Sequence, residues 1–209
     1  MDANKIKIAV CGDSYMCLDK DHVGTHFSEL LHGHYSVINL ARAGVSHVEI
    51  GFQLKQAIKL DPDYVFISST SSDRIEIPIG DTKNIEALQL DHFRPGPNRY
   101  YLSANIQTLI NGTDHGEFKA HMTYEIVDAV KKYLSYIYDD KLMKEINSWI
   151  IGYWLDQLRN AGIPHYLFDR TFVVYTDEDL LSPIYHTSYE TQIRAAKWTN
   201  DHLDSIFKG

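Results

Sequence analysis

The sequence predicts a three-layer α/β/α sandwich around a mostly parallel, flavodoxin-like sheet. Short apolar and β-branched runs, at 5–11, 35–40 and 61–67, alternate with segments whose apolar residues recur at helical spacing. Each run ends in a turn rich in glycine, serine or aspartate. Alternation of strands and helices is typical of parallel sheets joined by right-handed crossovers.

The first strand, at 5–11, is followed by Gly12, Asp13 and Ser14, which places Ser14 on a turn from strand to helix. In open α/β sheets this turn borders the crevice where ligands bind, and the next helix offers unpaired backbone N–H groups to an oxyanion. Ser14 is therefore a candidate nucleophile. The alternative is an ordinary turn or capping residue.

A helix is predicted next, because Val23, Phe27 and Leu30 share one face and Gly33 is placed to end it. Residues 35–40 then indicate a buried strand.

Gly44 follows that strand, just before a capping box that opens a helix at Ser46. A glycine there lets the backbone approach a ligand and offers its N–H as an oxyanion donor, or it only turns the chain.

The third strand, at 61–67, runs into the hydroxyl-rich segment 68–73, which is either a set of donors at the same sheet edge or a solvated loop.

Residues from about 75 to 123 are interpreted as an insertion into a single domain of 209 residues, because turn signals interrupt them throughout. Tyr100 and Tyr101 within it are candidates for stacking on a sugar ring, and a simple interface loop is the alternative. Two helices, near 124–134 and 149–158, and short strands at 165–168 and 172–175 follow.

His186 directly precedes a second capping box, at 187–190, and the last helix. The positive end of that helix dipole favours the neutral imidazole that a general base needs. His186 is therefore a candidate base, and a surface histidine is the alternative.

In order and strand context, these residues resemble the SGNH, or GDSL, hydrolase family along nearly the whole chain. The family has Gly-Asp-Ser after strand one, a glycine after strand two, Gly-x-Asn-Asp after strand three and a late Asp-x-x-His. The resemblance implies that Ser14 is the nucleophile, that Gly44 and the Ser14 N–H hold the oxyanion, and that His186 is the base.

Two positions depart from the family pattern. Ser72 stands where the family has asparagine and offers a shorter hydroxyl in place of an amide donor, with Thr70 as an alternative. Pro183 replaces the aspartate that orients the imidazole. Asp179 is the nearest upstream carboxylate to His186; the remaining candidates are a backbone carbonyl and two further acidic residues, Asp177 and Glu178.

Composition and motifs exclude several other functions. The net charge of -8, without a basic run, argues against a nucleic-acid partner. No apolar signal segment or stretch of about 18 apolar residues is present, so we expect a cytoplasmic protein with no membrane partner. No phosphate-binding glycine loop and no metal-ligand spacing appears, so we expect no cofactor and no metal.

These expectations combine into a serine esterase or deacylase that hydrolyses a small acyl ester through a Ser-His acyl-enzyme mechanism. An acylated carbohydrate, in particular an O-acetylated one, is a candidate substrate that follows from the resemblance alone. The alternative is a catalytically weak or inactive relative that binds a ligand in the same crevice or serves as an assembly protein. Ser72 and Pro183 favour that alternative.

Overall fold

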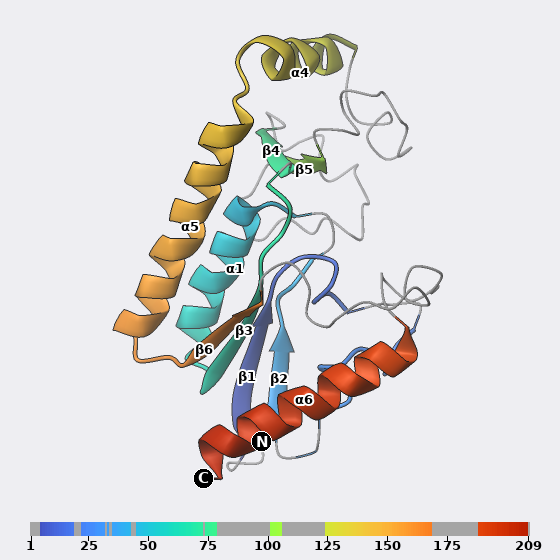
Figure 1. The fold of residues 1–209 in the computed structure, drawn as a ribbon, viewed down its shortest axis with the longest axis vertical. Helices are drawn as coiled ribbons and strands as arrows, with labels where there is room; N and C mark the ends of the chain where they lie inside the picture. The colour runs from blue at the N-terminus through green and yellow to red at the C-terminus, as the bar shows by residue number, and fades with distance from the viewer. Residues whose placement is uncertain are drawn as a thin grey trace.

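The computed structural model describes residues 5–18, 22–31, 33, 35–42, 45–72, 74–78, 101–105, 124–168 and 188–208. Its main sheet is all-parallel, in the order β2-β1-β3-β6, and consists of β1 (Ile6–Cys11), β2 (Tyr35–Asn39), β3 (Tyr64–Ser68) and β6 (His165–Phe168). Helices α1 (His47–Leu60) and α5 (Asp140–Asn160) cover one face, and α6 (Tyr189–Phe207) crosses the other (Figure 1). The predicted three-layer α/β class with a flavodoxin-like parallel sheet is confirmed.

Two apolar cores lie on opposite faces of this sheet because side chains alternate along each strand. On β1, Ile8 and Val10 face α6, whereas Ala9 and Cys11 face α1 and α5. The α6 side is completed by Phe27, Phe66, Ala195, Ala196 and Leu203, and the other side by Ile50, Leu54, Val65, Ile67, Ile151 and Leu158. Burial on both faces explains why the central strands β1 and β3 are mostly continuous apolar runs.

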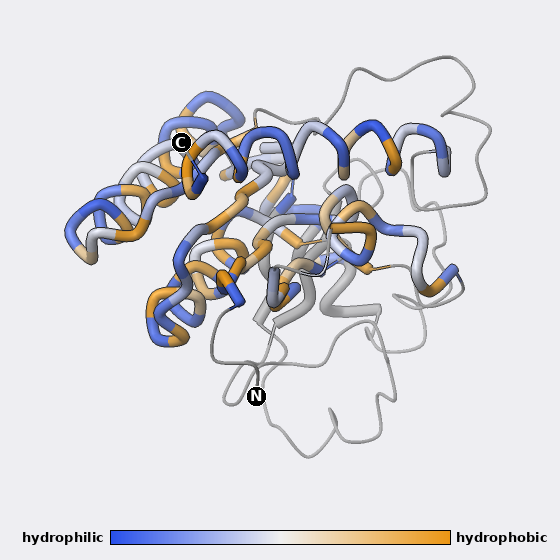
Figure 2. Tube along the Cα trace, turned by 90° about the horizontal axis from the view of Figure 1, so that it is seen from below, coloured by the Kyte–Doolittle hydropathy of each residue, from blue (hydrophilic) through white to orange (hydrophobic). Residues whose placement is uncertain are grey.

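Helix α1 begins where its capping box predicts, and α6 begins one residue later than the box at 187–190 predicts. Ser46 Oγ accepts the Val48 N–H at 3.0 Å, and Ser188 Oγ accepts the Thr191 N–H at 3.2 Å. In Figure 2, α6 is mostly hydrophilic with hydrophobic residues at intervals, as expected of a helix with one face on a core. No helix in the described ranges is long and apolar enough to cross a bilayer.

The prediction of a helix that ends at Gly33 was wrong, because residues 22–31 form turns and bends. Gly24 has a φ of 81°, which a regular helix does not allow. Phe27 donates its backbone N–H to Gln192 Oε1 of α6 at 2.7 Å, instead of to a carbonyl of its own segment. Phe27 is buried, but Val23 is 77% exposed, so the predicted apolar face does not pack as a unit.

The predicted insertion contains regular structure that turn signals did not reveal. β4 (Arg74–Pro78) and β5 (Tyr101–Asn105) pair as a separate antiparallel sheet, and α4 (Tyr124–Tyr136) follows. The rest of this region and the strand predicted at 172–175 lie outside the described residues. The single domain with an insertion stays a prediction.

Close packing of α1 against α5 depends on Gly51. A Cβ added there would lie 2.5 Å from Trp154 Nε1, whereas one added at Gly152 of α5 would meet nothing within 4 Å. Both glycines are in helix interiors, where alanine alone gains up to about 1 kcal/mol. Alanine variants of the two glycines therefore form a matched pair, because both make the same change in a helix interior and only the one at Gly51 meets a neighbouring side chain.

We expect Gly51→Ala to lower the free energy of unfolding by about 1–2 kcal/mol, because overpacking outweighs the gain in helix propensity. Gly152→Ala should leave it unchanged or raise it. Urea unfolding of both variants measures the difference. Equal stability of the two variants would show that the α1–α5 contact is looser than described.

Candidate functional site

The turn after β1 is held by a side chain of α1. Gln53 Oε1 accepts the Gly12 N–H at 2.7 Å, and Gln53 Nε2 donates to the Gly12 carbonyl at 3.1 Å. Gly12 has a φ of 152°, and a Cβ there would collide with Ser68 Oγ of β3. The turn therefore requires glycine and is fixed at the carboxyl edge of the sheet.

Asp13, the next residue, is a buried carboxyl at this edge. It is 2% exposed, and its Oδ1 accepts the Tyr15 N–H at 3.1 Å and the Ser68 hydroxyl at 3.3 Å. Burial raises the pKa of Asp13, and this is opposed by the Tyr15 N–H, the Arg74 charge and the hydroxyls of Thr70 and Ser68. The protonated form of the Asp13 carboxyl is thus favoured more in the protein than in water.

The Ser14 hydroxyl is enclosed. Ser14 is 4% exposed, and its Oγ has no hydrogen-bond partner among the described residues. A nucleophile that attacks an external substrate has to be presented to it. In this structure the hydroxyl is buried.

A buried imidazole that the sequence did not single out lies near the same turn. His26 is 4% exposed, and its Nδ1 is 2.8 Å from Ser28 Oγ in a hydrogen bond. Burial lowers the pKa of His26 to about 4, against the opposing effect of the Tyr15 backbone. His26 is therefore neutral at physiological pH.

A cavity of about 390 Å³ lies between α1, the segment after β3, and α5. Its polar wall includes the buried side chains of His47, Thr70 and Asn147. The remaining lining residues are Ser69, Ser72, Lys144, Ser148, Ile151, Gly152, Leu155 and Leu167. Within the described ranges, no three His, Cys, Asp or Glu side chains converge as a metal centre requires.

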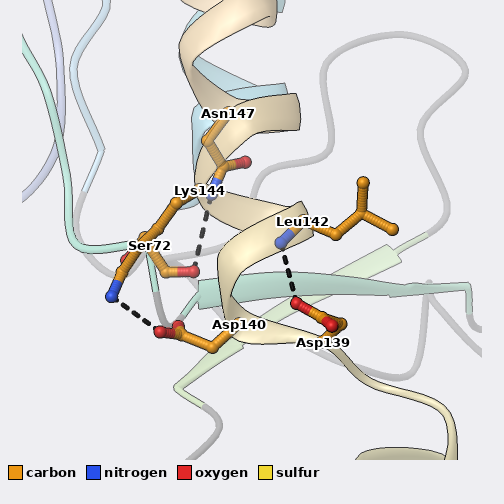
Figure 3. A network of polar contacts seen from close by, with 6 residues as sticks. All are labelled: Ser72, Asp139, Asp140, Leu142, Lys144 and Asn147. Atoms are coloured by element: carbon orange, nitrogen blue, oxygen red, sulfur yellow. Dashed lines mark hydrogen bonds and ion pairs between the residues drawn. The ribbon is translucent and has the colours of Figure 1, made fainter.

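Polar contacts tie the α5 side of the cavity to the segment after β3 (Figure 3). Asn147 Nδ2 donates to the Ser72 carbonyl at 3.5 Å. Lys144 Nζ pairs with Asp140 at 2.6 Å, one turn earlier on α5. Asp139 caps this helix by accepting the Leu142 N–H at 2.9 Å. Lys144 and Asn147 thus line the cavity from the first turns of α5, and the Asp139 cap stabilises the start of that helix.

The structure brings only some of the sequence-predicted site residues together. Ser72 and its alternative Thr70 line the cavity. Tyr101 lies in β5, and nothing is described of its side chain. Four predicted residues lie outside the described part of the chain: Gly44, Tyr100, Asp179 and His186. A meeting of Ser14 and His186 therefore stays a prediction.

Sequence reasoning missed His47, Gln53 and Asn147. A sequence signal existed for Gln53, which lies between Ile50, Leu54 and other apolar residues on the buried face of α1. His47 and Asn147 gave no comparable signal, because their burial depends on the packing of α1 against α5.

Comparison with known proteins supplies no family. No family model matches the chain, and no curated protein matches its sequence. Among solved structures it is similar to the crystal structure of pyroglutamyl peptidase I from Bacillus amyloliquefaciens, with 15% identity over 92% of each chain and a TM-score of 0.33. A likeness at that level supports no assignment of activity.

The predicted function, hydrolysis of a small acyl ester by a serine nucleophile, is corrected. The solved structure named above is that of a peptidase, and neither a family model nor a curated protein matches the chain to support an ester hydrolase. The enclosed Ser14 hydroxyl agrees with this correction. The statement that stands is coarser: the chain has an α/β fold built on a four-stranded parallel sheet.

Burial of His26 makes stability depend on pH. The pKa of His26 is about 4 in the folded protein and near the ordinary value of 6.5 in the unfolded chain. Between these values the unfolded chain binds the extra proton, so the contribution of His26 to stability is complete above pH 6.5 and falls by about 3 kcal/mol as the pH drops to 4.

Urea unfolding of the parent and of His26→Gln between pH 4 and 7 tests this expectation. The substitution should remove about 3 kcal/mol of the parent's pH dependence, whatever constant offset it adds. Parallel curves for the two proteins would contradict it.

Proposed function

We propose that this protein binds a small, oxygen-rich molecule in the cavity between α1 and α5. The observation that carries the proposal is the polar wall of this cavity. His47, Thr70 and Asn147 are each less than a tenth exposed, yet they line open space of about 390 Å³. Small-molecule sites combine an apolar surface with a few convergent polar groups in this way.

The position of the cavity also favours ligand binding. Ser69 and Thr70 directly follow β3, at the carboxyl edge of a parallel sheet. Open α/β sheets place their ligands at this edge, because the loops there converge and the helices on both sides leave a crevice. The volume falls within the range of roughly 300–1,000 Å³ typical of ligand pockets.

The lining defines the chemistry of the ligand. The hydroxyl, amide and imidazole groups of the lining suit a molecule with several hydroxyl or carbonyl oxygens. The apolar lining residues Ile151, Leu155 and Leu167 suit a short apolar group. An acylated carbohydrate, the partner expected from the sequence, or another small acyl ester combines these two features. The proposal concerns binding and assigns no reaction.

Filling the cavity should abolish binding. Gly152 lines it, and a Cβ added there meets nothing within 4 Å, so Gly152→Leu should fold normally and place its side chain in the open space. We expect at least about a tenfold loss of affinity for 6-O-acetylglucose. Titration of the protein with this sugar, followed by NMR chemical shifts, measures the effect.

Gly152→Ala is the matched control, because it makes the same backbone change with little added volume. It should bind as the parent does. Binding that survives in a folded Gly152→Leu protein would place the ligand elsewhere. A parent that binds none of 6-O-acetylglucose, glucose and methyl acetate would contradict the proposed function itself.

A further inference from the structure

We infer that the ligand of this cavity carries a carboxylate that Lys144 binds at the mouth, which makes it a sugar acid. The inference rests on the proposed function and specifies the ligand class of the same site. It depends on three properties of Lys144: its position, the charges around it and the weakness of its present ion pair.

Lys144 is placed to reach a bound molecule. It lines the cavity together with the deeper residues Asn147 and Thr70, while its own side chain is 54% exposed. Ser72 lines the same cavity, and Asn147, about one turn after Lys144 on α5, donates to the Ser72 carbonyl (Figure 3). A ligand whose hydroxyls contact the deeper wall would therefore have its outer end near the ammonium group.

The charges at the cavity select for an anion. Among the described lining residues, Lys144 carries the permanent positive charge, and none is an aspartate or glutamate. Figure 3 shows two carboxylates near Lys144: Asp140, which is ion-paired with it, and Asp139, which accepts the Leu142 N–H at the start of α5. The attraction between the ammonium group and a ligand carboxylate is therefore opposed chiefly by Asp140, which the ligand has to displace, and not by a lining residue.

The ion pair with Asp140 is weak enough to be exchanged. Both side chains are about half exposed, and they are four residues apart on one helix. Exposed pairs of this kind contribute little, because water screens the charges and two flexible side chains have to be ordered. Lys144 can thus exchange Asp140 for a ligand carboxylate, and Asp140 acts as its competitor.

Glucuronate and glucuronamide test this inference, since they differ only in the carboxylate and its neutral amide. NMR titration of the parent should show about fivefold tighter binding of glucuronate. Lys144→Gln should remove this preference without weakening glucuronamide binding. Asp140→Asn should strengthen glucuronate binding about twofold, because the competing carboxylate is gone.

Lys141→Gln is the control, because it removes the same charge from an exposed residue of the same helix that does not line the cavity. It should keep the preference for glucuronate. Equal binding of both probes by the parent, at a site that Gly152→Leu blocks, would overturn this inference and leave the proposed function intact. Binding of neither probe would overturn the inference, and the 6-O-acetylglucose titration then decides the proposed function separately.

Discussion

The hydrogen-bonded pair between the Gln53 amide and the backbone of Gly12 is the contact on which the carboxyl edge of the sheet depends. Gly12 ends β1 in a conformation that favours glycine, and both its N–H and its carbonyl bond to Gln53 inside the protein. A buried N–H without a partner costs about 1–3 kcal/mol. The pair therefore stabilises the turn and also fixes where Asp13 and Ser14 lie.

Because Gln53 belongs to α1, the same helix connects the turn to the cavity. The first residue of α1, His47, lines the cavity, and Gly51 allows α5 to approach closely. α5 in turn supplies Asn147 and Lys144. The helix pair packed on β1 and β3 thus positions His47, Asn147 and Lys144, while β3 and β6 position Thr70 and Leu167. The position of α1 affects the shape of the site, so a change in α1 packing should alter both the turn after β1 and the cavity.

The sequence predicted those features that local rules determine. The strands were predicted from short apolar runs. The capping boxes predicted the start of α1 at Ser46 and that of α6 to within one residue of Ser188, because a cap requires only neighbouring residues. The segment 22–31 was mispredicted because Gln192, distant in sequence, takes the Phe27 N–H. The cavity was missed for the same reason: the burial of His47 and Asn147 arises from packing between helices. The esterase prediction depended on a resemblance in residue order, which does not report whether the Ser14 hydroxyl is accessible.

Amide hydrogen exchange at Gly12 tests the account most directly, with the Ala9 amide in the middle of β1 as the internal reference. In the parent, the Gly12 amide should be protected to a degree similar to that of Ala9, because Gln53 accepts its hydrogen bond. In Gln53→Met, which keeps the length of the side chain but not the amide, Gly12 should exchange at least about tenfold faster relative to Ala9. An unchanged ratio of the two rates would show that Gln53 does not hold the turn, and would contradict the account.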